Sequence, residues 1–283
     1  MKTKKLLLAV VAIMSMTSVW AQFPDPFIPD DKRSNGINWI PQPPSLTGGD
    51  FANDFYYYQW GKEQREEEWV ADWALWDEGI DLSRVFGPCL AIELTHETTP
   101  EILLLAEAAT SDAHQANFIV KNHFQRKRPF ATFNEPSLKP EEDQEEAKTF
   151  SYPSGHSSRG WMYAMVLATV APECTEELMA RARIYAIHRV VCGHHWKSDI
   201  DASLMLVAGV FPQVVVSEGY QAQLKKARAE YLKIKGGDSS SAKALTANEA
   251  KAKTPIYDMQ GRVLNGEPTS KGIYIKDGVK FAK

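Results

Sequence analysis

Cysteine is scarce in this sequence of 283 residues, and its pattern excludes two kinds of small scaffold. The three cysteines, Cys89, Cys174 and Cys192, are odd in number and far apart, which argues against a disulfide framework. None of them has the close Cys/His spacing of a structural zinc site. We therefore expect three free and buried thiols.

Dense basic patches and long apolar runs are missing as well. The formal net charge is −4, and no basic stripe marks a surface for a nucleic acid polymer. The apolar segment 202–216 is interrupted by Gly209, Pro212 and Gln213, so no run reaches the roughly 20 residues that a membrane span needs. The mean hydropathy of −0.34 agrees. We expect a water-soluble protein without a membrane span.

The first 21 residues have the features of a secretory signal peptide. Three lysines near the start precede the apolar run LLLAVVAIM, and a small residue, Ala21, ends the segment. Cleavage after Ala21 would remove these three positive charges and no negative one, which changes the net charge from −4 to −7. We therefore expect an exported protein, located in the periplasm, at the cell surface or outside the cell.

The remaining chain is long enough for one large domain, which we predict to be all-α and to cover residues 22–236. Residues 22–48 are rich in proline, glycine and asparagine and predict an extended arm over that domain. Helical patterns follow from Asp54 onward. Three tryptophans at positions 69, 73 and 76 share one helical face, which we interpret as core packing rather than as a ligand platform.

The composition changes twice near the C-terminus. Residues 237–253 are rich in serine, alanine and lysine and predict a flexible linker. In residues 254–283, Asp277-Gly278 separates two apolar stretches and predicts a β-hairpin. The pattern IYDMQGR…KGIYI resembles the C-terminal sorting tails of type IX secretion, which implies contact with that secretion machinery. A small β appendage without a sorting role is the alternative.

Three polar blocks stand out in the domain, and the central one is Pro153-Ser154-Gly155-His156. A helical pattern starts directly after this turn, so the turn's backbone N–H groups have no intrahelical partners. Such a helix start favours an anion, and His156 would lie beside it. On its own, this block is better explained as an ordinary helix start with a surface histidine than as an anion site.

Two further blocks argue against that simpler interpretation. Upstream, Lys121 and Arg128 are seven residues apart, and Pro129 follows. Downstream, Arg189, His195 and Asp199 are spaced by six and four residues. Because residues i and i+4 of a helix are neighbours, the histidine and aspartate at the end of this block can meet.

The order K-x6-R-P, P-S-G-H and R-x5-H-x3-D resembles the signature of the phosphatidic acid phosphatase type 2 superfamily, which also contains the vanadium-dependent haloperoxidases. The stretches FSYPSGHSS and RVVCGHHWKSD resemble the bacterial class A non-specific acid phosphatases. The resemblance extends from about Asn38 to about Gln223 and implies a helical bundle. The chain departs from the family at His188, where serine is usual before the arginine.

The residue types fit phosphoryl transfer. Three cations, from Lys121, Arg128 and Arg189, can surround phosphate oxygens together with the Ser154 hydroxyl and the Ser154–Gly155 amides. The resemblance implies the remaining roles. His195 attacks phosphorus and forms a phosphohistidine, Asp199 orients His195, and His156 gives a proton to the leaving oxygen. We expect no metal or organic cofactor, and phosphate or vanadate to occupy the site as product or inhibitor.

The sequence leaves several alternatives open. The clustered His188, His194 and His195 are weak candidates for a zinc site, because one short segment cannot bring all three together. The acidic residues of segment 134–148 lack the spacing of a calcium loop and predict a solvated connection next to the pocket. We interpret the other histidines, at positions 96, 114 and 123, as structural or surface residues.

The predicted function is an acid phosphatase acting on small phosphomonoesters, such as nucleotides, sugar phosphates and aryl phosphates. A vanadium-dependent haloperoxidase is the main alternative, because it uses the same cage of donors. A surface binding protein on an inactive phosphatase scaffold is another. The sequence does not decide whether the chain forms a homo-oligomer.

Overall fold

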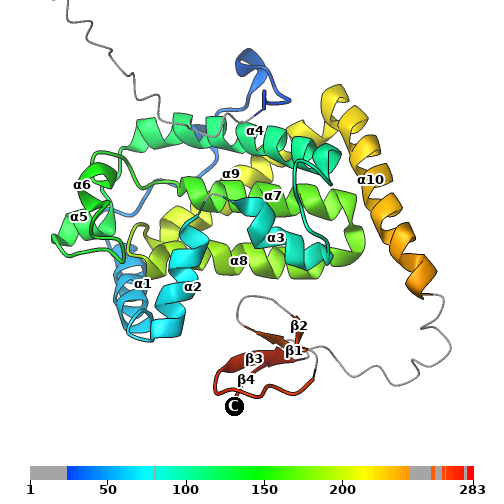
Figure 1. Cartoon of the computed structure of the whole chain (residues 1–283). Coiled ribbons are helices and arrows are strands. Elements are labelled where there is room, and N and C mark those ends of the chain that lie inside the picture. The colour runs from blue at the N-terminus through cyan, green and yellow to red at the C-terminus, as the bar shows by residue number, and fades with distance from the viewer. Residues whose placement is uncertain (1–23, 80, 243–255, 259–262, 265, 277–278) are drawn as a thin grey trace, which may run out of the picture.

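The computed structural model of the protein describes residues 24–79, 81–242, 256–258, 263–264, 266–276 and 279–283. Its main body is helical (Figure 1), which confirms the predicted all-α class. The described helices are α1 (Phe51–Gln64), α2 (Glu68–Glu78), α3 (Leu82–Leu90), α4 (Pro100–Phe124), α5 (Pro129–Phe133), α6 (Asp143–Glu146), α7 (Gly155–Val170), α8 (Thr175–Val191), α9 (Lys197–Val216) and α10 (Glu218–Ala242), with the short 3-10 turns η1 (Asp30–Lys32), η2 (Gly36–Asn38) and η3 (Pro172–Cys174).

Helix α7 is the centre of the bundle. It lies between α4 and α8 and also packs on α9 (Figure 1). Its contact with α8 is close, because a Cβ atom on Gly160 would lie only 2.5 Å from the Tyr185 ring. Buried alanines line the inner face of α4, among them Ala106, Ala109 and Ala113, and small side chains let helices approach closely.

Helix α9 continues without a break through Gly209, Pro212 and Gln213, the residues that interrupt the apolar segment 202–216 of the sequence. Tertiary packing maintains the helix, because Leu206 and Val210 are fully buried and Gly209 makes room for the Trp39 ring. Within the described residues, α9 is the one helix with the length and apolar character of a membrane span. Its packing against α4 and α7 is that of a core helix.

The N-terminal arm crosses α4 and α9. The backbone amides of Phe27 and Ile28 donate hydrogen bonds of 2.9 and 3.1 Å to the carboxylate of Asp112 on α4. Ser34 contacts Gln213 of α9 through a backbone-to-side-chain bond of 3.3 Å. The predicted signal peptide lies outside the described residues.

Helix α10 extends to Ala242, so the first six residues of the predicted 237–253 linker are helical. The rest of that linker lies outside the described residues. The C-terminal segment has more strands than one hairpin, namely β1 (Ile256–Asp258), β2 (Val263–Leu264), β3 (Ile273–Lys276) and β4 (Val279–Ala282). They form an antiparallel sheet in the order β2-β1-β3-β4. Asp277 and Gly278, between β3 and β4, are not among the described residues.

The three cysteines are free thiols, but only one of them is buried. Cys192 is enclosed, whereas Cys89 and Cys174 are half-buried, which corrects the expectation of three buried thiols. Burial raises the pKa of Cys192 to about 12, so this thiol stays protonated and unreactive at neutral pH.

The order of the helices brings the three polar blocks to one end of the bundle. The C-terminal ends of α4 and α8 and the N-terminal ends of α7 and α9 meet there, next to α2, α5 and α6 (Figure 1). Two helix N-termini at one place supply partial positive charge in addition to any side-chain cations.

Candidate active site

The start of α7 forms the floor of the site. Ser154 is the N-cap, and its hydroxyl oxygen accepts from the Ser157 amide at 3.3 Å and from the Ser157 hydroxyl at 3.0 Å. The Ser154 amide donates to the carbonyl of Asp199 at 3.1 Å, which joins the starts of α7 and α9. The Gly155 amide follows in the first turn of α7, where backbone donors lack intrahelical acceptors.

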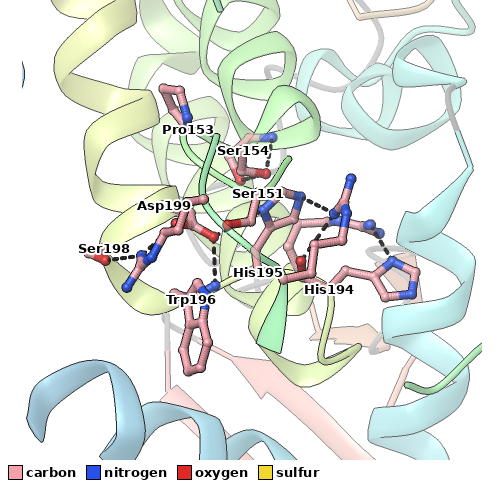
Figure 2. A network of polar contacts seen from close by, with 12 residues as sticks. Ser151, Pro153, Ser154, His194, His195, Trp196, Ser198 and Asp199 are labelled. Atoms are coloured by element: carbon pink, nitrogen blue, oxygen red, sulfur yellow. Dashed lines mark hydrogen bonds and ion pairs between the residues drawn. The ribbon is translucent and has the colours of Figure 1, made fainter. Parts of the chain in front are cut away.

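His195 and Asp199 meet at the start of α9, as their spacing predicts. The ring Nδ1 of His195 lies 3.3 Å from an Asp199 carboxylate oxygen, and that oxygen also accepts from the Trp196 amide at 2.8 Å. Figure 2 shows Asp199 beside His195, with its carboxylate turned toward the Trp196 backbone. Both side chains are almost completely buried, so water does not compete for this contact.

The neighbours of His195 define its tautomer. Its Nε2 faces a guanidinium nitrogen of Arg128 at 3.2 Å, and an arginine can only donate. Nε2 therefore carries the lone pair, and Nδ1 carries the hydrogen that points to Asp199. Burial lowers the pKa of His195 well below its ordinary value, and Arg128 and Lys121 lower it further. The ring is therefore neutral, and the lone pair of Nε2 faces Arg128.

Arg126 forms a second layer behind Asp199. One guanidinium nitrogen donates to the free oxygen of Asp199 at 2.7 Å, and the other donates to Asp54 of α1 at 2.6 Å. Burial raises the pKa of Asp199, and the charge of Arg126 opposes this rise. Arg126 therefore stabilises the ionised form of the carboxylate that orients His195.

Arg189 is anchored from α8 by an acidic residue of α2. One of its terminal nitrogens donates to Glu78, and the other donates to Nδ1 of His194 at 2.9 Å. Burial alone would lower the pKa of Arg189, but the Glu78 carboxylate outweighs it and raises this pKa. The remaining donor, Nε, is buried without a hydrogen-bond partner in the described part of the chain. A buried orphan donor of this kind is suited to an anion that enters the site.

Lys121 lies in the last turn of α4, where its amino group donates to the Phe150 carbonyl at 2.6 Å. Burial lowers the pKa of Lys121 to about 7, and the charge of Arg128 contributes to the shift. The lysine is therefore fully charged only on the acidic side of neutrality.

Arg128 precedes α5 and is held by the acidic connection. Its guanidinium donates to Thr149 at 2.8 Å and forms an ion pair of 2.6 Å with Glu146 of α6. The arginine is buried, whereas more than a third of the Glu146 side chain is exposed. The acidic segment thus borders the site. The Glu146 carboxylate pairs with a guanidinium nitrogen of Arg128 that a bound phosphate would also contact.

His156 lies in the first turn of α7, with its Nε2 3.2 Å from the Glu78 carbonyl. Burial lowers its pKa well below the ordinary value, and Arg189 and Arg159 lower it further. The ring is therefore neutral in the free site. A bound dianion would raise this pKa, because an opposite charge nearby favours the protonated ring.

The clustered histidines do not converge on one point. His188 contacts Asp77 at 2.6 Å, His194 contacts Ser137 at 3.0 Å, and His195 contacts Asp199. In Figure 2, His194 points away from Asp199, toward the side of the site where α2 lies. Within the described residues, no group of three histidine, cysteine or acidic side chains could hold a metal ion.

The departure from the family at His188 lies outside the cage. Its ring is buried against Trp73, and Asp77 links it to Arg181. Burial would raise the pKa of Asp77, but the hydrogen bonds from His188 and Arg181 outweigh it, and the pKa is lowered. His188 therefore links α8 to α2 through Asp77. This pair directly precedes the pair Arg189 and Glu78, which meet in the site.

All eight candidate residues thus lie in one connected site, and three important partners were missing from the prediction. Glu78 was missed because it is 111 residues away from Arg189, without a motif of its own. Asp54 was missed for the same reason. Arg126 lies within the first polar block, between Lys121 and Arg128, and that position was its only signal.

Comparisons with known proteins show the family of this chain. The family model described as PAP2 superfamily matches residues 101–219. The chain is 30% identical to a non-specific acid phosphatase of Salmonella typhimurium over 220 residues, 74% of this chain and 85% of that protein. It is 29% identical to the non-specific acid phosphatase of Providencia stuartii over 74% of this chain and 86% of that protein. The chain therefore belongs to the PAP2 superfamily and, within it, to the family of the bacterial non-specific acid phosphatases.

Proposed function

We propose that the protein is an exported acid phosphatase that hydrolyses small phosphomonoesters through a phosphohistidine. The observation that carries the proposal is the buried Nε of Arg189, a cationic donor without a partner in the described residues, in the same site as a neutral His195. The relatives' names support the reaction class, because each is a phosphatase.

In the first step, the phosphoryl group is held by Lys121, Arg128 and Arg189 and by the donors at the start of α7. The Nε2 lone pair of His195 forms a bond to phosphorus while the bond from phosphorus to the ester oxygen breaks. His156, protonated once the dianion is bound, gives its proton to the leaving oxygen. Asp199 stabilises the positive charge that develops on the His195 ring.

In the second step, water replaces the alcohol. His156, now neutral, accepts a proton from water as the water oxygen bonds to phosphorus, and the bond from phosphorus to His195 breaks. Inorganic phosphate leaves, and both histidines return to their starting states. The three cations supply the charge stabilisation that a metal ion supplies in many phosphoryl-transfer enzymes, so no step needs a metal.

The remaining parts of the proposal concern substrates and location. A cage that contacts only the phosphoryl group favours broad use of nucleotides, sugar phosphates and aryl phosphates. Residues 1–21 support export, and the C-terminal segment supports sorting by a type IX machinery. Vanadate should bind the cage as an inhibitor, because it resembles phosphate in charge and shape.

The two histidine roles can be separated by leaving group. A sugar phosphate needs a proton on its leaving oxygen, whereas p-nitrophenolate leaves with little help. His156→Ala should therefore slow phosphorylation by the sugar phosphate by about 10²–10⁴-fold and by p-nitrophenyl phosphate far less. The same variant should accumulate an acid-labile phosphoenzyme in quenched reactions, because water then lacks its base.

His195→Ala is the matched control and should form no phosphoenzyme from either ester. Equal losses on both esters in the phosphorylation step of His156→Ala would show that His156 is not the acid. Halide oxidation in the presence of vanadate and peroxide, without turnover of phosphoesters, would favour a haloperoxidase instead. Folded protein without either activity would favour a binding protein.

A further inference from the structure

Positive charge continues beyond the phosphate cage along the first turns of α7. Arg159 follows Gly155 by four residues and His156 by three, so its side chain lies on the same helix face as both. Its Nε donates to the Gly155 carbonyl at 3.3 Å. Gly155, His156 and Arg159 are half-buried, in contrast to the enclosed Ser154, and therefore form the side of the site that reaches solvent.

Helix α4 adds a second basic group on the same side. His114, Asn117 and Lys121 have the i, i+3, i+7 spacing of one helix face. Asn117 packs this face on the Pro153–Ser158 turn, because its amide donates to the Pro153 carbonyl at 3.3 Å and to the Ser158 hydroxyl at 3.0 Å. His114 lies one turn before this contact and is half-buried.

The pKa shifts of these groups agree with this placement on adjacent helix faces. Burial lowers the pKa of His114, and Arg159 and Lys121 lower it further. Burial also lowers the pKa of Arg159, and the charge of Arg189 adds to the shift. His114 and Arg159 are therefore influenced by the positive charges of Lys121 and Arg189, respectively.

Arg159 extends from a firmly held part of the helix. The next residue, Gly160, has its backbone against the Tyr185 ring of α8, at a distance that leaves no space for a side chain. This contact fixes the start of α7, so the guanidinium begins at a defined distance from the anion-binding turn.

We propose that His114 and Arg159 form a second anion subsite beside the cage, which selects phosphomonoesters whose leaving group carries its own carboxylate or phosphate. The proposal rests on the proposed function, because the leaving group must lie next to His156. Arg159 follows His156 by one helical turn, and its planar fork suits both kinds of oxyanion. The subsite thus places an anionic substituent within a few bonds of the ester oxygen.

A pair of esters that differ in one charged group tests the proposal. 2-Phosphoglycerate and glycerol 2-phosphate have the same secondary ester, but a carboxylate in the first replaces a hydroxymethyl group in the second. The wild type should have the higher kcat/KM on 2-phosphoglycerate. In Arg159→Gln, the ratio of the two kcat/KM values should fall about ten-fold, the value of one charge-assisted hydrogen bond. Arg159→Lys should keep part of the ratio, and His114→Gln should lower it less than Arg159→Gln.

Inhibition distinguishes a second phosphate from a carboxylate. Pyrophosphate should lose more affinity than orthophosphate in Arg159→Gln, because only pyrophosphate reaches both sites. Arg183→Gln, which removes an exposed cation of α8, is the matched control and should leave both ratios at their wild-type values. If only the ester ratio responds, the subsite is specific for carboxylates.

Unchanged ratios in a folded Arg159→Gln variant would overturn the subsite. Failure of the wild type to hydrolyse either ester would instead contradict the proposed function. Binding can still be measured in that case, as the rise in melting temperature caused by pyrophosphate relative to orthophosphate. Arg159→Gln should reduce this difference, and an equal difference in variant and wild type would also overturn the subsite. If Arg159→Gln does not fold, Arg159→Lys and His114→Gln provide the same comparison.

Discussion

The alkaline limit of activity should be set by Lys121. Burial lowers the pKa of this lysine to about 7 in the free enzyme, and kcat/KM reports the ionisation of the free enzyme. At pH 6 about nine in ten lysines carry the charge, and at pH 8 about one in ten do. If only the charged form binds the phosphoryl group productively, the ionisation of Lys121 by itself lowers kcat/KM about ten-fold between these two values.

The substitution Lys121→Arg tests this reasoning, because an arginine keeps its charge above pH 12. The variant should decline about ten-fold less than the wild type between pH 6 and pH 8, whatever its absolute rate, because the proton that His156 needs is common to both proteins. The ester also titrates, because the second pKa of a phosphate ester is near 6, but this change is the same for both proteins and cancels in the ratio of variant to wild type. Activity should be measured as released phosphate, since the absorbance of p-nitrophenol itself depends on pH.

Stability provides a second measurement on the same residue. The pKa of Lys121 is about 7 in the folded protein, below its ordinary value of 10.5, so the unfolded chain binds more protons between these values. The lysine therefore makes the free energy of unfolding rise with pH across that window, and Lys121→Met should remove this rise.

For the activity experiment, an equal decline of kcat/KM between pH 6 and pH 8 in wild type and Lys121→Arg would refute the role of Lys121.

Three other predictions follow from the structure. Activity should survive EDTA treatment, because the cage consists of side-chain cations; loss on chelation with recovery on adding zinc would contradict this. Glu146→Gln should lower the inhibition constant of orthophosphate up to about five-fold, because a partly exposed competitor for Arg128 is removed; an unchanged or higher constant would argue against competition. A chain that ends at Ala242 should keep its turnover and melting temperature but accumulate elsewhere in its host, and unfolding of this shorter chain would show that the C-terminal strands belong to the core.

The sequence predicted the candidate site residues better than the neighbouring residues that hold them in place. Lys121, Ser154 and His195 were predicted because the three polar blocks resemble a superfamily signature, and their residue types suit phosphate. Glu78 was not predicted, because its partner Arg189 lies on another helix and any acidic residue of suitable reach could have served. Partners across long sequence separations follow from packing, and one sequence does not record packing.

The extent of two helices also depends on packing. Gly209 and Pro212 interrupt the apolar segment 202–216, and both residue types are unfavourable inside a helix. The helix continues because its apolar face is buried against α4 and α7, and this burial outweighs local preference. The linker boundary at residue 236 was wrong because composition alone does not determine where α10 ends.

The central position of α7 has a consequence for how the enzyme unfolds and loses activity. The turn Ser154–Gly155, which we propose to bind the phosphate, begins the helix that packs against α4, α8, α9 and α10. In such an arrangement, the start of α7 cannot unfold locally without exposing the hydrophobic core. Amide protons at the start of α7 should therefore exchange with solvent only through global unfolding. Heating should then abolish catalysis and compact structure at the same temperature. If the protein is exported as we propose, few partly unfolded states would be open to proteases outside the cytoplasm.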